Sequence, residues 1–183
     1  MPWTTPGTAT AGSVLTAAFW NEQVRDNMNV LRAMVNVQQA VKTDTTSSTS
    51  SSFADIAGLS VTITPTFNTS KILLAASVQV GISNTSYWIP FRFTRDGTAI
   101  GIADAAGVRT RATFEAFPSY LLTTENASFE YLDSPATVSA VTYKLQWAIV
   151  GGVTGYLNRG SDDIDNAARF RTISTLIARE IPV

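Results

Sequence analysis

The chain of 183 residues is 45% hydrophobic and only 15% charged, a composition that supports one substantial hydrophobic core with a small appendage. Its 13 basic and 14 acidic residues leave a net charge of −1, so nothing favours nucleic acid or an anionic membrane, and no apolar run approaches the roughly 18 residues of a membrane-spanning helix. The sequence contains neither cysteine nor histidine, which excludes disulfides, thiolate metal sites and the usual general base, and we expect neither an enzyme nor a cofactor.

Residues 1–15 (MPWTTPGTATAGSVL) are predicted to form an N-terminal arm without regular structure. Two prolines, two glycines and many threonines and alanines interrupt any helical or strand pattern. Trp3 stands apart in this small-residue context, and two interpretations of it are open. Either it packs on the helix of its own chain or, as we favour, it anchors the arm when the arm docks on a partner.

Residues 16–41 carry the one long helical pattern, and Thr16 is suited to be its N-cap. The helix is amphipathic, with a seam of residues at alternating spacings of four and three: Trp20, Val24, Asn27, Leu31, Met34, Gln38 and Val41. We favour self-association through this seam, in which Asn27 costs stability but fixes the register. In the alternative, Asn27 faces solvent and a stripe of Trp20, Val24, Met28, Leu31 and Val35 docks on the β-rich part of the chain.

Residues 42–52 (KTDTTSSTSSS) are predicted to be a linker, because nearly all of them carry hydroxyl groups. From residue 53 to 183, apolar and polar residues alternate with a period of two, and turn signals separate about eight short strands. The strand patterns fall within residues 59–63, 71–80, 87–94, 99–102, 108–117, 119–123, 127–132, 141–149 and 170–181. Asp96-Gly97 marks a hairpin. The sequence therefore predicts a mainly β fold, an N-terminal α-helix followed by an antiparallel β-sandwich of the jelly-roll type.

Aromatic, amide and arginine side chains near the predicted turns are candidates for contact with a receptor, because such side chains in loops bind sugars and protein hot spots. They are Tyr87, Trp88, Tyr156, Asn158 and Arg159. The other interpretation is that Trp88 and Tyr156 fill the sandwich core or an interface between subunits.

Three nearby carboxylates, at Asp162, Asp163 and Asp165, are a weak candidate for a calcium site, since calcium prefers oxygen ligands from a loop. The segment lacks the spacing and the glycine of an EF-hand. We therefore favour a solvated acidic loop and predict no metal site.

Short motifs in both parts of the chain resemble the virion proteins of tailed bacteriophages. The N-terminal part resembles the segment that precedes a variable distal domain in many of these proteins, through Trp3, AGSVLTAAFWN at residues 11–21 and VRDN at residues 24–27. The later part resembles the β-sandwich of phage tail fibres, through LSVTITP (59–65), SKILL (70–74), RDGT (95–98), YLDSP (131–135), VTYKLQ (141–146) and ISTL (173–176).

This resemblance implies a homotrimer with an N-terminal attachment region, a short helical bundle and a TNF-like jelly-roll head. Trp3, Val14 and Phe19 would attach the protein to other tail or capsid proteins, in a virion assembled in the host cytoplasm. The head, residues 53–183, would contact a glycan or protein on the host surface. Two alternatives stay open: a capsid decoration or head fibre without a receptor role, and a free carbohydrate-binding lectin-like module.

Overall fold

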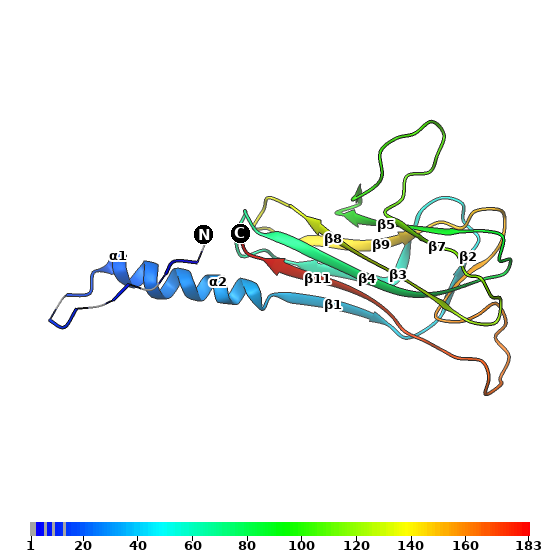
Figure 1. Cartoon of the computed structure of the whole chain (residues 1–183), viewed down its shortest axis with the longest axis horizontal. Helices are drawn as coiled ribbons and strands as arrows, with labels where there is room; N and C mark the ends of the chain where they lie inside the picture. The colour runs from blue at the N-terminus through cyan, green and yellow to red at the C-terminus, as the bar shows by residue number, and fades with distance from the viewer. Residues whose placement is uncertain (1–2, 6, 9, 13) are drawn as a thin grey trace.

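The computed structural model describes residues 3–5, 7–8, 10–12 and 14–183, so residues 1, 2, 6, 9 and 13 of the predicted arm lie outside the described part. A helical rod projects from one end of a β-sandwich (Figure 1). The rod consists of α1 (Ala17–Trp20), the π-helical turn η1 (Asn21–Asp26) and α2 (Asn27–Met34). Thr16 caps the rod as predicted, since its hydroxyl accepts a hydrogen bond of 3.2 Å from the amide of Phe19. Within the described residues, no helix is both long and apolar enough to cross a membrane.

The helix is shorter than predicted, because it ends at Met34 and not at residue 41. Residues Val37–Lys42 form strand β1 instead and pair along their whole length with strand β11 (Ser174–Ile181). The positions Val37 and Val41 satisfy a helical period as well as an alternating one, and pairing with a neighbouring strand decides between them. The predicted linker is also partly regular, since β2 (Thr46–Ser48) pairs with β10 (Gly155–Leu157).

Two antiparallel sheets form the sandwich, and these strands complete them: β3 (Ala54–Ile63), β4 (Lys71–Ile82), β5 (Ile89–Arg95), β6 (Thr98–Ile100), β7 (Phe114–Ala116), β8 (Glu125–Asp133) and β9 (Val141–Trp147). We call the sheet with the order β1-β11-β4-β10-β2, in which β8 also pairs with β4, sheet A. Sheet B has the order β3-β9-β5-β6, and β7 also pairs with β5. The mainly β class and the antiparallel sandwich are thus as predicted.

The alternating patterns predict the long strands well and the short ones poorly. On β4 every second residue from Ile72 to Val80 is buried between the sheets, and β11 lies between β1 and β4. Asp96 and Gly97 both have positive φ and close the β5–β6 hairpin. In contrast, only Phe114–Ala116 of the segment 108–117 is a strand, and residues 119–123 form a turn, so the prediction of two full strands there is wrong.

A buried carboxylate joins the rod to the sandwich. Glu180, on β11, is fully buried, and its Oε1 accepts hydrogen bonds from the hydroxyl of Ser70 at 2.6 Å and from the amide of Thr66 at 2.7 Å. Its Oε2 accepts from the side chain of Asn36 at 2.7 Å, directly between the helix and β1. Burial raises the pKa of Glu180, but the hydrogen bonds outweigh this and hold its pKa below the ordinary value. Neutral donors therefore stabilise this charge at the base of the rod.

The two ends of the sandwich differ in structure. Lys71, at the start of β4, pairs with Ile181 beside the Glu180 network, whereas Ile82, at the other end, pairs with Gly155. A strand of 12 residues spans about 36 Å. The loops 83–88, 117–124 and 158–172 therefore lie at the end remote from the rod, on the right in Figure 1, and we call this the distal end.

Candidate functional site

The N-terminal arm folds back along the rod, and Asn27 holds it there. The side chain of Asn27 accepts from the amide of Thr4 and donates to the Thr4 carbonyl, both at 3.0 Å. Farther along, the amide of Gly7 donates to the side chain of Gln23 at 2.6 Å. Asn27 is buried by these contacts. It therefore lies neither in an exposed seam nor in solvent, and both sequence-based interpretations of Asn27 are corrected.

The rod exposes a continuous apolar stripe on another face. It comprises Trp20, Val24, Met28, Leu31 and Val35, with Met34 beside it, and Trp20 is 56% and Leu31 46% exposed. These are the residues of the alternative stripe, but they stand free and are not docked on the sandwich. Of the residues predicted for self-association, Trp20, Val24, Leu31 and Met34 are thus exposed on the rod, and Asn27 alone is buried.

The three predicted attachment residues lie along the arm and the start of the rod. Trp3 is half exposed, Val14 is exposed, and Phe19 is half buried. A Cβ atom at Gly7 would lie 3.4 Å from the ring of Phe19, so the arm passes close to that ring. Trp3 and Val14 are accessible to a partner, and Phe19 supports the folded arm.

At the distal end the predicted contact residues separate into exposed and structural ones. Trp88 is 46% exposed and packs against the half-exposed ring of Phe117, with ring centroids 5.4 Å apart. Tyr87, one residue earlier, packs on the core and against Gly151, where any Cβ atom would clash with its ring. Trp88 is thus available for contact, whereas Tyr87 holds the loop.

Asn158 is structural, which corrects its assignment as a contact residue. It is fully buried and has a positive φ of 63°. Its Nδ2 donates to the carbonyls of Lys42 and Asp44, both at 2.9 Å, and its Oδ1 accepts from Ser174 at 2.6 Å. Asn158 therefore ties the distal loops to the strands beneath them.

The neighbouring Tyr156 and Arg159 lead into a pocket of about 330 Å³ at the distal end. The Arg159 guanidinium stacks on the ring of Tyr156, 4.0 Å from its centroid, and donates to the carbonyls of Gly160 and Ser161. Gly160 is part of the pocket wall and packs closely on the loop 117–124, because a Cβ atom there would lie 2.6 Å from the Leu122 carbonyl oxygen. The pocket lining is Leu122, Arg159, Gly160, Asp162, Asp163, Ile164, Asp165, Asn166, Arg169, Phe170 and Arg171.

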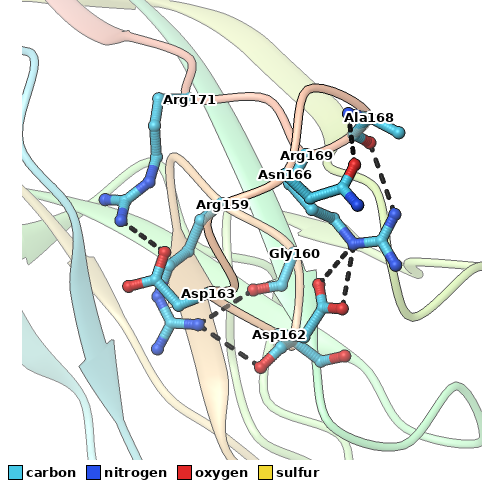
Figure 2. A network of polar contacts seen from close by, with 9 residues as sticks. Arg159, Gly160, Asp162, Asp163, Asn166, Ala168, Arg169 and Arg171 are labelled. Atoms are coloured by element: carbon cyan, nitrogen blue, oxygen red, sulfur yellow. Dashed lines mark hydrogen bonds and ion pairs between the residues drawn. The ribbon is translucent and has the colours of Figure 1, made fainter.

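Arginines neutralise two of the three aspartates of the weak calcium candidate (Figure 2). Both oxygens of Asp162 accept from Nε of Arg169, at 2.8 and 2.9 Å, and Asp163 forms an ion pair with Arg171. Asp165 is exposed. Within the described residues, no group of three Asp, Glu, His or Cys side chains is placed to hold a metal ion.

Sequence reasoning missed Phe117, Arg169, Phe170 and Arg171. The segment 170–173 was included in the last predicted strand, but β11 begins only at Ser174, and residues 169–171 belong to the distal loop. One signal in the sequence could have indicated these residues. Arg169 follows Asp162 by seven residues and Arg171 follows Asp163 by eight, and a loop of that length can bring such side chains together.

Comparison with known proteins gives no family assignment. The sequence matches no protein-family model, and a search of curated proteins finds no significant match.

Proposed function

We propose that the protein is a homotrimeric structural protein of a bacteriophage virion, a tail-fibre-like appendage that attaches through its N-terminus and presents its head to the host surface. In this proposal the sandwich is a jelly roll. The sheet orders β1-β11-β4 with β8, and β3-β9-β5 with β7, support that reading, since each sheet combines strands from both halves of the chain. The sequence motifs at residues 11–27 support the virion assignment.

The observation that carries the proposal is the exposed apolar stripe on a rod that projects away from the head. A helix of this length is marginal in water, and five large apolar side chains in contact with solvent make it more so. Packing the stripes of three copies against each other removes these side chains from water. The arm would then lie on the outside of the bundle, where Trp3 and Val14 are free to contact the particle.

The outer face of sheet A provides a second surface for association. It carries Ala75 on β4 directly beside Ile177 on β11, with Leu73 two residues along β4 and Val41 of β1 one pair farther, opposite Thr175. Ala75, Ser77, Thr175, Ile177 and Glu130 line a shallow groove of about 470 Å³ on this face. A rod of two to three heptads does not hold a trimer alone, and this face would add the apolar area that the rod lacks.

Sedimentation of the full chain tests the trimer. The expected mass is three times the 19.6 kDa of one chain. Leu31→Glu places a charge in the stripe and should dissociate the trimer, because a charge buried between helices costs several kcal/mol. Arg32→Glu, at the adjacent exposed position, is the matched control and should leave the mass unchanged. A wild-type chain that stays monomeric at micromolar concentration overturns the proposal.

A deletion of residues 1–34 tests attachment to the particle. The deletion keeps Asn36 and β1, which belong to the head. For a virion appendage, the shortened chain should fold but fail to join particles. If the protein is a free lectin-like module, the shortened chain should keep all its sugar binding. If it is a capsid decoration, the full chain should join particles, and particles that lack it should adsorb to host cells as well as complete ones.

A further inference from the structure

The charges of the distal pocket cancel. Arg159, Arg169 and Arg171 contribute three positive charges, and Asp162, Asp163 and Asp165 contribute three negative ones, so the lining has no net charge. From this arrangement we propose that the distal pocket binds a neutral sugar unit of a surface glycan. The inference rests on the proposed function, in which the distal end faces the host, and names the chemical class of the ligand.

The ion pairs arrange donors and acceptors side by side. In the pair Asp162–Arg169, the contacts within the described chain use two of the five guanidinium donors, Nε toward Asp162 and Nη1 toward the Ala168 carbonyl. The carboxylate retains lone pairs, because two oxygens accept about four hydrogen bonds. Figure 2 shows this pair beside Asn166 and the pair Asp163–Arg171 across the same loop. Each pair thus offers a donor next to an acceptor.

Neighbouring hydroxyl groups match this pattern better than charged groups do. A hydroxyl both donates and accepts, so two adjacent hydroxyls of a sugar satisfy a guanidinium and a carboxylate together. The carboxylate of an acidic sugar accepts hydrogen bonds but donates none, so it leaves the carboxylates of the pocket without a donor, and Asp162 and Asp163 repel its charge. An ammonium group donates only, and the arginines repel it.

The pocket also has an apolar side. Phe170 is 69% exposed and Ile164 more than half exposed, and both line the pocket. Sites for small ligands combine such apolar surface with a few fixed polar groups. The C–H face of a sugar ring is suited to pack on the ring of Phe170 while its hydroxyls contact the ion pairs.

One part of the pocket wall is tightly packed, and such preorganisation reduces the entropic cost of binding. The amide of Ser161 donates to the Leu121 carbonyl at 2.7 Å, and the backbone at Gly160 touches Leu122 with no room for a side chain. Arg159 is stacked on Tyr156. Arg159 is therefore held in position before a ligand arrives.

Saturation-transfer NMR on the full chain tests the proposal directly. The neutral probes are the methyl glycosides of glucose, galactose and mannose, together with N-acetylglucosamine; the acidic probes are glucuronic acid and N-acetylneuraminic acid. We expect at least one neutral sugar to bind, and the acidic sugars to bind at least about tenfold more weakly. Asp162→Asn and Phe170→Ser should each weaken binding about tenfold or more, the effect of losing one hydrogen bond to a charged group or one apolar contact face.

Matched controls lie on the loop 101–113, away from the pocket. Asp104→Asn removes an exposed carboxylate and Val108→Ser an exposed apolar side chain, and neither should change sugar binding. Phe170→Ser keeps both ion pairs, so its result stays informative if Asp162→Asn disturbs the loop. The proposal is overturned if no neutral sugar binds, if the acidic sugars bind more tightly, or if the pocket variants bind like the wild type. A trimer that joins particles but binds no sugar overturns this inference alone, whereas a monomer that binds sugar through the pocket overturns only the proposed function.

Discussion

The two sheets of the sandwich have very different outer faces. On sheet B, Asp55 accepts from both Lys144 and Gln146 at 2.7 Å, and Gln146 in turn accepts from Arg92 at 2.8 Å. The guanidinium of Arg92 also lies 4.2 Å from the ring centroid of Phe53. On sheet A, the middle of the outer face carries aliphatic and small residues on the central strands, among them Ala75, Ser77 and Ile177, and the charged Arg179 of β11 lies nearer the rod, opposite Leu73. One face is thus covered by its own polar network and the other is not.

This difference indicates which of the two outer faces is suited to contact with solvent. A polar network across β9 and β5 satisfies its donors and acceptors within one chain. A contiguous apolar face at Leu73, Ala75 and Ile177 gains free energy only when something covers it. The contrast supports an assembly in which sheet A faces inward and sheet B faces solvent.

The largest expected effect comes from removing the carboxylate inside sheet A. Glu180→Ala leaves the hydroxyl of Ser70 and the side chain of Asn36 without their acceptor, at the point where the rod meets the head. We expect a loss of about 3 kcal/mol in the free energy of unfolding, as for other broken buried polar networks. Urea denaturation measures this loss. Glu115→Ala, an exposed glutamate on β7 of sheet B, should change the stability by less than about 0.5 kcal/mol; similar losses for the two variants would contradict the role of Glu180.

A charge on the outer face of sheet A tests the comparison most directly. Ile177 lies opposite Ala75 of β4 and Gln39 of β1, near the middle of this face. Ile177→Glu should raise the dissociation constant of the assembly at least about 100-fold, which corresponds to about 2.7 kcal/mol. Ser60→Glu places the same charge on sheet B, opposite Lys144, and should leave association unchanged. Equal effects of both variants in sedimentation would remove the distinction between the faces.

The pH dependence of stability separates the buried carboxylate from the exposed ones. The pKa of Glu180 in the folded chain lies below its ordinary value of 4.5. The ionised carboxylate therefore contributes its full share to the free energy of unfolding above pH 4.5, and this share is lost as the pH falls through the folded pKa. Glu180→Gln lacks this titration and should cost about 1–2 kcal/mol at neutral pH. The difference between wild type and Glu180→Gln should stay constant from neutral pH down to about 5.5 and shrink below 4.5. A difference that grows in acid would contradict this assignment.

The sequence predicts the regular elements of this molecule better than its polar connections. Long strands such as β4 follow from strict alternation, because burial on one face imposes a period of two. The end of the helix could not be predicted in this way, because Val37 and Val41 fit both a helical and an alternating period. The choice between helix and strand depends on a partner strand more than 130 residues later in the chain. Local patterns carry no information about such distant pairing.

The candidate site residues also show that local sequence patterns do not predict contacts between distant segments. The residue types of Trp88 and Arg159 make them contact candidates, and the structure leaves Trp88 exposed and stacks Arg159 on Tyr156. Asn27 and Asn158 were misassigned because their roles are hydrogen bonds to backbone groups of distant segments, the arm and the end of β1. Glu180 follows Arg179 on a strand, and only the alternation of β11 tells that one of the two charges must point inward.

The smallest expected effect concerns the ion pair on sheet B. Lys144→Ala removes one of the two donors to Asp55, but both side chains of this pair are about 40% exposed, at 40% and 43%. Hydrogen bonds from Lys144 and Gln146 lower the pKa of Asp55. The stabilisation by its ionised carboxylate is therefore present above the ordinary pKa and is lost as the pH falls through the pKa of the folded chain. Solvent screens such a pair, and we expect a loss of no more than about 0.5 kcal/mol at neutral pH, smaller still in 1 M salt. Urea denaturation at low and high salt measures it. A loss as large as that of Glu180→Ala would mean that the sheet B face, too, depends on its polar network for folding and not only for contact with water.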